Sequence, residues 1–148
     1  MLTQPEIDFL LNALKELVQR GNYDFPTPGS GKQIDLATHD GKEKFIVDIN
    51  RRGKIKITKC TYQERYRKDE ILLRLDIDGP RHTNPDGQTV PPNHLHICRE
   101  GFGDSWAYPL PNGVFSDTTD LTNTLIEFLE YCKVTNVSDI SIQGGFFS

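Results

Sequence analysis

Residues 71–78 of the chain read Ile-Leu-Leu-Arg-Leu-Asp-Ile-Asp, and this stretch decides the fold class. Its odd-numbered positions are all apolar: Ile71, Leu73, Leu75 and Ile77. Its even-numbered positions are Leu72, Arg74, Asp76 and Asp78. Because successive side chains of a β-strand point to opposite faces, this alternation predicts a strand with one buried face and one partly hydrated face.

The segments around this strand show the same period of two. Residues 34–36 alternate before the hairpin signal Asp40-Gly41, and residues 45–50 alternate after it. A turn then leads to a further predicted strand at residues 54–58, and a long loop later precedes a strand at residues 94–98. Short turns between such segments favour an antiparallel meander of about five strands.

A helix is predicted at each end of the chain. Thr3 and Glu6 have the spacing of a capping box, and apolar residues at helical spacing predict a first helix over about residues 4–20. The second helix covers about residues 118–132, with Asp117 or Thr118 as its N-cap. We therefore expect an α+β fold in one domain, residues 1–148: a single antiparallel sheet of about five strands, with both helices packed on one face.

The composition excludes several classes of protein. The 148 residues carry 17 Lys and Arg against 21 Asp and Glu, a net charge of −4, and 36% are apolar. No apolar run approaches the roughly 20 residues that cross a bilayer, and the N-terminus lacks the basic and apolar regions of a secretory signal. We therefore expect a cytoplasmic protein with no membrane partner.

The net charge hides a basic segment at residues 51–68. This segment holds eight basic residues and one acid, Glu64, so its charge is +7 and the rest of the chain carries −11. Lys and Arg neutralise phosphates and aromatic rings stack on unpaired bases, which predicts contact with RNA or DNA. The residues proposed for that contact are Arg51, Arg52, Lys54, Lys56, Lys59, Tyr62, Arg65, Tyr66 and Arg67. There are two alternatives for this segment: it is a solvated hairpin without a ligand, or it docks on an acidic protein.

Three of the four histidines fall within 15 residues, as His82, His94 and His96. His94 and His96 are two residues apart, so on a strand they share a face. Leu95 and Ile97 take the apolar face, which leaves the histidine pair on the polar face. Asp76 and Asp78 are predicted on the polar face of the preceding strand, and the loop between the strands can carry His82 back over it.

Three kinds of chemistry fit these residues. In the first, which needs no cofactor or metal, His94 or His96 is the general base, His82 the general acid and a cation stabilises the transition state of RNA cleavage. Candidates for the cation are Arg74, Arg81 and Lys56, and Asp78 would orient an imidazole. In the second, His94, His96 and Glu100 hold a metal, as in the first motif of cupins, although the second cupin motif is absent. In the third, the histidines and aspartates only satisfy one another.

The chain resembles an uncharacterised domain family of bacteria and their phages, and its His82 and His94-x-His96 signature is the most specific part of the resemblance. The resemblance is carried by residues 73–77, residues 82–87 (HTNPDG), residues 94–97 and Trp106-Ala107. It implies a cytoplasmic setting and no particular reaction. The chain also resembles TumE-type toxins of toxin–antitoxin pairs, in the tyrosine- and arginine-rich residues 62–67 followed by Asp76, His82, His94 and His96.

The resulting hypothesis is a small cytoplasmic bacterial or phage protein that engages RNA or DNA, with endoribonuclease activity of the toxin type and an antitoxin as protein partner. The alternative is a phage accessory protein without enzymatic activity. Such a protein would inhibit a host defence complex, as anti-CRISPR proteins do, by occupying a protein or nucleic-acid site. Its acidic remainder would then mimic the charge of a nucleic acid.

Overall fold

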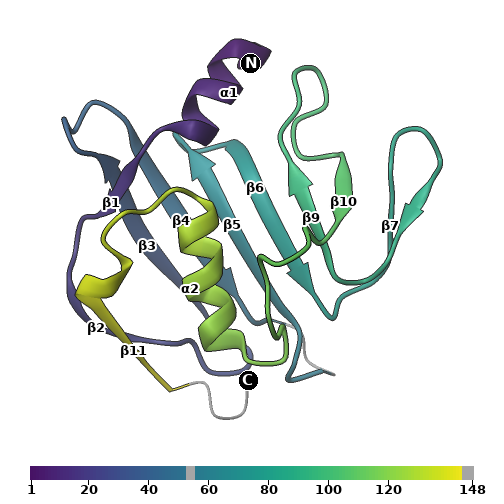
Figure 1. Cartoon of the computed structure of the whole chain (residues 1–148). Helices are drawn as coiled ribbons and strands as arrows, with labels where there is room; N and C mark the ends of the chain where they lie inside the picture. Colours follow the sequence, from purple (N-terminus) through teal and green to yellow (C-terminus); the bar gives the residue numbers. More distant parts are fainter. Residues whose placement is uncertain (53–55, 145–148) are drawn as a thin grey trace.

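The main β-sheet has seven strands, and every pair of neighbouring strands is antiparallel (Figure 1). The computed structural model describes residues 1–52 and 56–144. In spatial order the strands are β1 (Lys15–Leu17), β3 (Gly31–Thr38), β4 (Lys44–Asn50), β5 (Cys60–Tyr66), β6 (Glu70–Ile77), β9 (His94–Ile97) and β10 (Ala107–Pro109). The α+β class is confirmed, and the sheet is larger than the five strands predicted.

Two helices and two small sheets complete the described chain. The helices are α1 (Gln4–Asn12) and α2 (Leu121–Tyr131), with a 3₁₀ turn η1 (Val137–Asp139) after α2. The small sheets pair β2 (Gly21–Asp24) in parallel with β11 (Ile140–Gln143), and β7 (His82–Thr83) in antiparallel with β8 (Thr89–Val90). Neither described helix is long and apolar enough to cross a membrane.

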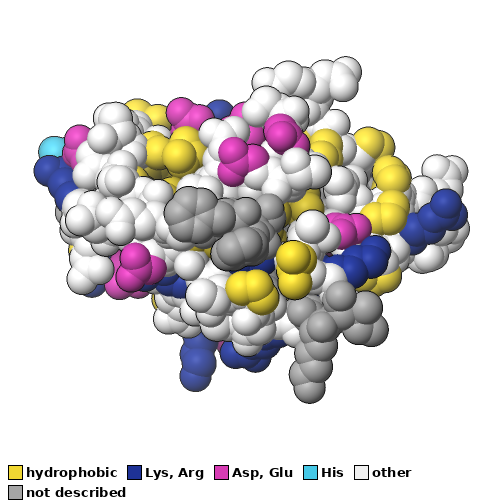
Figure 2. All heavy atoms as spheres, turned by 90° about the horizontal axis from the view of Figure 1, so that it is seen from below, with side chains coloured by type: hydrophobic (Ala, Val, Ile, Leu, Met, Phe, Trp, Pro, Cys, Tyr) yellow, Lys and Arg dark blue, Asp and Glu magenta, His cyan; other side chains and the backbone are white. Residues whose placement is uncertain are grey.

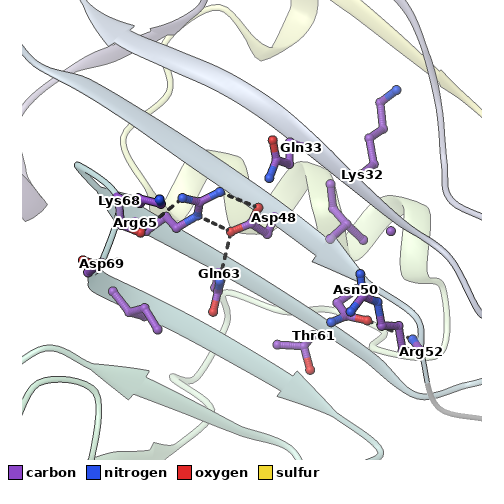
Figure 3. A pocket seen from close by; sticks show the side chains of 13 residues that line it. Lys32, Gln33, Asp48, Asn50, Arg52, Thr61, Gln63, Arg65, Lys68 and Asp69 are labelled. Atoms are coloured by element: carbon purple, nitrogen blue, oxygen red, sulfur yellow. Dashed lines mark hydrogen bonds and ion pairs between the residues drawn. The ribbon is translucent and has the colours of Figure 1, made fainter.

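The two faces of the main sheet differ in what covers them. Helix α2 lies over one face, where the ring of Phe128 is 5.9 Å from that of Tyr62 and the Tyr62 hydroxyl donates to the Leu121 carbonyl at 2.8 Å (Figure 1). Ile7 and Leu10 of α1 join the same apolar core. Figure 3 views part of the opposite face, and there the helix ribbon lies behind the strands and none crosses in front of them.

Strand β5 lies at the centre of the sheet and was missed by the sequence prediction. Residues 56–59 form a turn where the strand at residues 54–58 was predicted, and residues 54 and 55 of that predicted strand lie outside the described residues. In β5, the side chains of Cys60, Tyr62, Glu64 and Tyr66 are all buried. Because β5 is buried on its α2 side, its aromatic residues belong to the core, and the basic segment is not a surface hairpin.

The first helix ends at Asn12, not near residue 20 as predicted. The capping box of Thr3 and Glu6 is present, so the prediction of where the helix begins is confirmed. After Ala13 the chain becomes extended, and Lys15–Leu17 pairs with residues 36–38 of β3. The bonds gained at the sheet edge outweigh the helical spacing, and Leu14 and Val18 of the predicted stripe are 66% and 60% exposed.

The second helix begins three residues later than predicted. Its N-cap is Asp120, whose carboxylate accepts from the Asn123 backbone at 3.0 Å. The predicted cap Asp117 instead accepts from the backbone and hydroxyl of Thr119, in a turn that precedes the helix. Both aspartates offer the same capping chemistry, so the packing of Leu121 against the core selects between them.

A buried ion pair joins the edge strand β1 to the central strand β5 and to α2. Lys15 Nζ lies 3.1 Å from Glu64 Oε2 and donates to the Cys132 carbonyl at 3.0 Å, and both charged side chains are 0% exposed. Burial raises the pKa of Glu64 to about 7, although the nearby Lys15 acts in the opposite direction. The pair fixes the position of β1, because a buried charge without its partner is strongly unfavourable.

Removing one partner of this pair is expected to destabilise the fold far more than removing both. Lys15→Met should lower the free energy of unfolding by about 3–5 kcal/mol, because Glu64 is left alone in the core. The double variant Lys15→Met/Glu64→Leu should recover most of that loss. Chemical denaturation of the two single variants and the double variant measures the coupling.

The matched control is Arg20→Met, which removes an exposed ion pair with Asp139 and should change stability by less than about 1 kcal/mol. Additive losses in the double variant would show that Lys15 and Glu64 do not act as a pair.

Candidate nucleic-acid site

Two rows of polar side chains cross the face of the sheet opposite α2, which we call the open face. Residues opposite each other on neighbouring strands point to the same face, so the strand register defines the rows. The first row is Gln33, Asp48, Gln63, Arg74 and His96. The second row is Asn50, Thr61, Asp76 and His94. The basic segment and the histidine cluster therefore contribute to one continuous surface.

A hollow of about 780 Å³ lies over the β3–β6 part of this face (Figure 3). Asp48 lies in this hollow and accepts from Arg65 Nε at 2.7 Å and from Gln63 Nε2 at 2.9 Å. The polar and charged side chains around it are Lys32, Gln33, Asp48, Asn50, Arg52, Thr61, Gln63, Arg65, Lys68 and Asp69. Amide, hydroxyl and cationic groups thus alternate around a space that no described helix fills.

Cations outnumber anions around the hollow. Asp48 neutralises Arg65, whereas Arg52 and Lys68 are exposed and form no ion pair within residues 1–52 and 56–144. Figure 2, which views the lower end of the molecule, shows Lys and Arg side chains at its left, lower and right edges. Unpaired cations around a polar hollow attract an anionic ligand.

A second hollow of about 300 Å³ continues the first toward β6. The two hollows share Asn50, Thr61 and Gln63, so they adjoin. The second hollow is also lined by Arg74 and Asp76, which belong to the histidine cluster. A ligand that follows the face from the larger hollow therefore reaches that cluster.

Arg74 is the centre of the cluster's charge network. Its guanidinium contacts Asp76 at 3.1 and 3.3 Å and donates to Asp104 Oδ2 at 2.8 Å. Its Nη2 also donates to His96 Nε2 at 3.0 Å. Arg74 remains 28% exposed, so this cation faces solvent while it holds two carboxylates and an imidazole.

His94 and His96 are buried, with side chains that are 1% exposed. His94 Nδ1 lies 2.6 Å from the Pro91 carbonyl, and His96 Nδ1 lies 2.8 Å from the Asp104 carbonyl. Both Nε2 atoms point at Asp76 Oδ2, at 3.2 and 3.3 Å. Together with Asp76, the two imidazoles form the one group in the described chain that could hold a metal ion, with ligand atoms within 4.8 Å of one another.

His82 covers this pair from the β7–β8 arm, residues 82–90. Its ring centre lies 4.6 Å from that of His96 and 5.8 Å from that of His94, and its Nε2 donates to the Ser105 carbonyl at 2.7 Å. Asn84 anchors the arm, because its side chain bonds both the carbonyl and the N–H of Ala107 on β10. His82 is partly exposed, so it is the imidazole of the three that solvent reaches.

The electrostatics of the cluster keep Asp76 ionised. Burial by itself would raise the pKa of Asp76, but its contacts with His96 and Arg74 outweigh the effect of burial and lower the pKa to about 2. The anionic form of Asp76 is therefore the one that its neighbours hold at neutral pH. Thiol chemistry, in contrast, is disfavoured, because burial raises the pKa of Cys60 to about 12 and that of Cys98 to about 11.

Several predicted catalytic residues lie outside the cluster. Asp78 accepts from Thr58 and Lys56 and orients no imidazole. Arg81 is exposed on the loop before β7, whereas Arg74 is the candidate cation that contacts the cluster. Glu100 lies beyond the end of β9, where it bonds the backbone of Gln4, so it cannot complete the predicted metal set. The prediction assumed that the strand continues to residue 100, but β9 ends at Ile97 and the alternation of faces does not extend to Glu100.

The predicted nucleic-acid residues divide in the same way. Arg52, Lys59 and Arg65 line the two hollows. Arg51 is 2% exposed and its guanidinium donates to the carbonyls of Pro26 and Ile57.

Burial removes both tyrosines of the prediction from base stacking. Tyr62 is 0% exposed and Tyr66 is 8% exposed. Arg67 lies over the Tyr66 ring beside α1, Lys56 pairs with Asp78, and Lys54 is outside the described residues.

The sequence prediction missed four residues that shape the site. Gln63 alternates with buried neighbours on β5, so a correct assignment of that strand would have found it. Asp48 alternates with buried neighbours on β4, a strand that was predicted, but it was not proposed as a site residue. Lys68 was counted in the basic segment but was not proposed as a contact. Asp104 carries no local signal, because it meets Arg74 only when the β9–β10 turn folds back.

Comparison with protein-family models gives a match over most of the chain. The family described as "Family of unknown function (DUF6978)" matches residues 2–134. The chain belongs to this family. The match covers the whole open face and the histidine cluster, so the site lies within the family domain. No curated protein and no solved structure matches the chain.

Loss of the Asn84 anchor is expected to loosen the arm that carries His82. Asn84→Ala removes two hydrogen bonds to Ala107, so amide hydrogen exchange in residues 82–90 should accelerate by roughly tenfold or more. Asp86→Ala is the control, because it removes a contact to Gln88 inside the turn and leaves the anchor intact. Equal exchange rates in the two variants would mean that Asn84 does not hold the arm.

Proposed function

We propose that this protein binds single-stranded RNA along the open face of its sheet and cleaves it at the histidine cluster. The observation that carries the proposal is the continuity of the two hollows, which joins unpaired cations to Arg74 and Asp76. We also propose the bacterial or phage, cytoplasmic and toxin-type setting. The four residues Asp76, His82, His94 and His96, which carry the resemblance to TumE-type toxins, lie in contact with one another.

The polar groups of the face favour a single strand over a duplex. A ligand that extends from Asp48 on β4 to His96 on β9 crosses three strand spacings, about 14 Å. Exposed amide side chains such as Gln33 and Gln63 offer both donors and acceptors to unpaired base edges, while Arg52 and Lys68 suit phosphates. A duplex hides the base edges that such amides would bond.

The cluster offers the groups that phosphodiester cleavage needs. The 2′-hydroxyl of RNA attacks the adjacent phosphorus, and the bond to the 5′ oxygen breaks. Arg74 keeps an exposed guanidinium that offsets the charge growing on the phosphoryl oxygens. His82 is the imidazole within reach of a bound strand, so it is the candidate for moving the proton from the 2′-hydroxyl toward the leaving oxygen.

This assignment differs from the roles that the sequence suggested. His94 or His96 was predicted to be the general base, but their 1% exposure keeps a bound RNA strand from touching them in this arrangement. We propose instead that they position Asp76 and Arg74. Asp104 holds the far side of Arg74 and so limits the directions in which the guanidinium can point.

Charge reversal in the larger hollow is expected to weaken RNA binding. Arg52→Glu and Lys68→Glu should each raise the Kd for a short single-stranded RNA by roughly tenfold and reduce the salt dependence of binding. Fluorescence anisotropy at two salt concentrations measures both effects. Lys42→Glu makes the same charge change on the exposed β3–β4 turn and should leave the Kd within about twofold. Equal Kd values for all three variants would contradict the binding face.

Loss of Arg74 or His82 is expected to stop cleavage while RNA binding remains. His82→Ala should slow the cleavage of labelled RNA by at least about 100-fold, as removal of a proton-transfer group does. His39→Ala, which removes an exposed histidine outside the cluster, should cleave at the wild-type rate. If wild-type protein binds RNA and leaves it intact, the alternative of a binding protein without enzymatic activity replaces this proposal.

A further inference from the structure

We infer that Asp76, His94 and His96 form a binding site for one divalent transition-metal ion of the Zn²⁺ class. The three ligand atoms are Asp76 Oδ2, His94 Nε2 and His96 Nε2. This site goes beyond the proposed function and does not depend on it, because metal binding is measurable without RNA. Strands β6 and β9, which carry the ligands, are neighbours in the sheet (Figure 1).

The hydrogen bonds of the two imidazoles fix the direction of their lone pairs. A backbone carbonyl only accepts, so Nδ1 of His94 donates to Pro91 and Nδ1 of His96 donates to Asp104. In a neutral imidazole the lone pair then lies on Nε2. Metal-binding histidines show this arrangement, with one ring nitrogen held by a carbonyl and the other facing the ion.

Three acceptor atoms therefore face one another in a buried place. Asp76 Oδ2 carries negative charge, and both Nε2 atoms point at it from a distance of 3.2–3.3 Å. His96 Nε2 has a donor, Arg74 Nη2, but His94 Nε2 has no donor among the described residues. A bound cation would offset the repulsion between this lone pair and the carboxylate.

The distances between the three atoms also fit the coordination shell of a metal ion. A charge-assisted bond between an imidazolium and a carboxylate is about 2.7–2.9 Å long. Zinc lies about 2.0–2.2 Å from nitrogen and oxygen ligands, which places two ligands of a tetrahedral ion about 3.3 Å apart. The two Nε2–Oδ2 distances of 3.2 and 3.3 Å match this separation and exceed the length of the hydrogen bond.

Arg74 is the competitor for this position. Its Nη2 occupies the Nε2 lone pair of His96 and also bonds Asp76 Oδ2 at 3.3 Å, so metal binding must displace both contacts. Asp104 keeps Arg74 in place at 2.8 Å when this happens, and Asp76 Oδ1 keeps its contact with Arg74 Nε. The ion would thus replace the two contacts of Nη2, and the contacts of Arg74 with Asp76 Oδ1 and Asp104 would remain.

Three protein ligands leave at least one coordination position open, as catalytic zinc sites do. Asp76 lines the smaller hollow, so the ion would lie in the wall of the proposed RNA face. Imidazole and carboxylate ligands suit Zn²⁺ and its neighbours in the first transition row more than Mg²⁺ or Ca²⁺. The third ligand comes from the neighbouring strand and not from Glu100, which the His-x-His spacing had suggested.

The test is metal titration of the untagged protein after chelator treatment and dialysis. Calorimetry with Zn²⁺ should show one ion per chain, and Co²⁺ should give the intense visible absorption of a low-symmetry site. Asp76→Asn and His94→Gln should each weaken Zn²⁺ binding by at least about 100-fold, because a ligand is lost and not only its support. His39→Ala should bind like the wild type, and Arg74→Gln should bind at least as tightly, because the competing guanidinium is gone.

Circular dichroism identifies variants that remain folded, and the two ligand variants serve as alternatives if one of them does not. No Zn²⁺ binding by folded wild-type protein at millimolar concentration overturns the site. Binding that persists unchanged in a folded Asp76→Asn or His94→Gln variant overturns it as well. If the wild-type protein binds Zn²⁺ but does not cleave RNA, that result would count against the proposed function alone.

Discussion

The antiparallel register between β6 and β9 places Arg74 opposite His96 and Asp76 opposite His94. Because opposed side chains on neighbouring strands lie about 5 Å apart, this pairing alone assembles four of the five residues in the cluster. A shift of β9 by one residue would turn His94 and His96 toward α2 and bring Leu95, the buried partner of Leu75, to the open face. The burial of those leucines therefore holds the site in register.

The same alternation along β5 builds the core and the ligand face from one strand. Tyr62 and Glu64 point toward α2, while Gln63 and Arg65 point into the larger hollow. The Lys15–Glu64 pair then connects β5 to the edge strand, so it supports the sheet on which the hollow lies. A buried ion pair favours one arrangement of strands, because any other arrangement leaves a charge unpaired.

Arg74 links the two proposals for the open face. As an exposed cation it suits a phosphodiester, and as the donor to His96 it competes with a metal ion. A bound ion would release Nη2 from His96 while Asp104 keeps the guanidinium nearby. The proposed metal site and the proposed RNA site therefore differ in what occupies the cluster and share the residues that shape it.

The sequence by itself determined the α+β class, the polar face of β6 and the common face of His94 and His96 on one strand. These features follow from period-two patterns and capping residues, which are local. The sequence predicted the first helix too long, missed β5 and named Glu100 as a ligand, since sheet pairing and chain reversal are not local. Only the tertiary structure brought Asp104 to Arg74 and Asp76 to both histidines. Those contacts join residues 18–30 positions apart, and the burial of the sheet's other face decides which of them form.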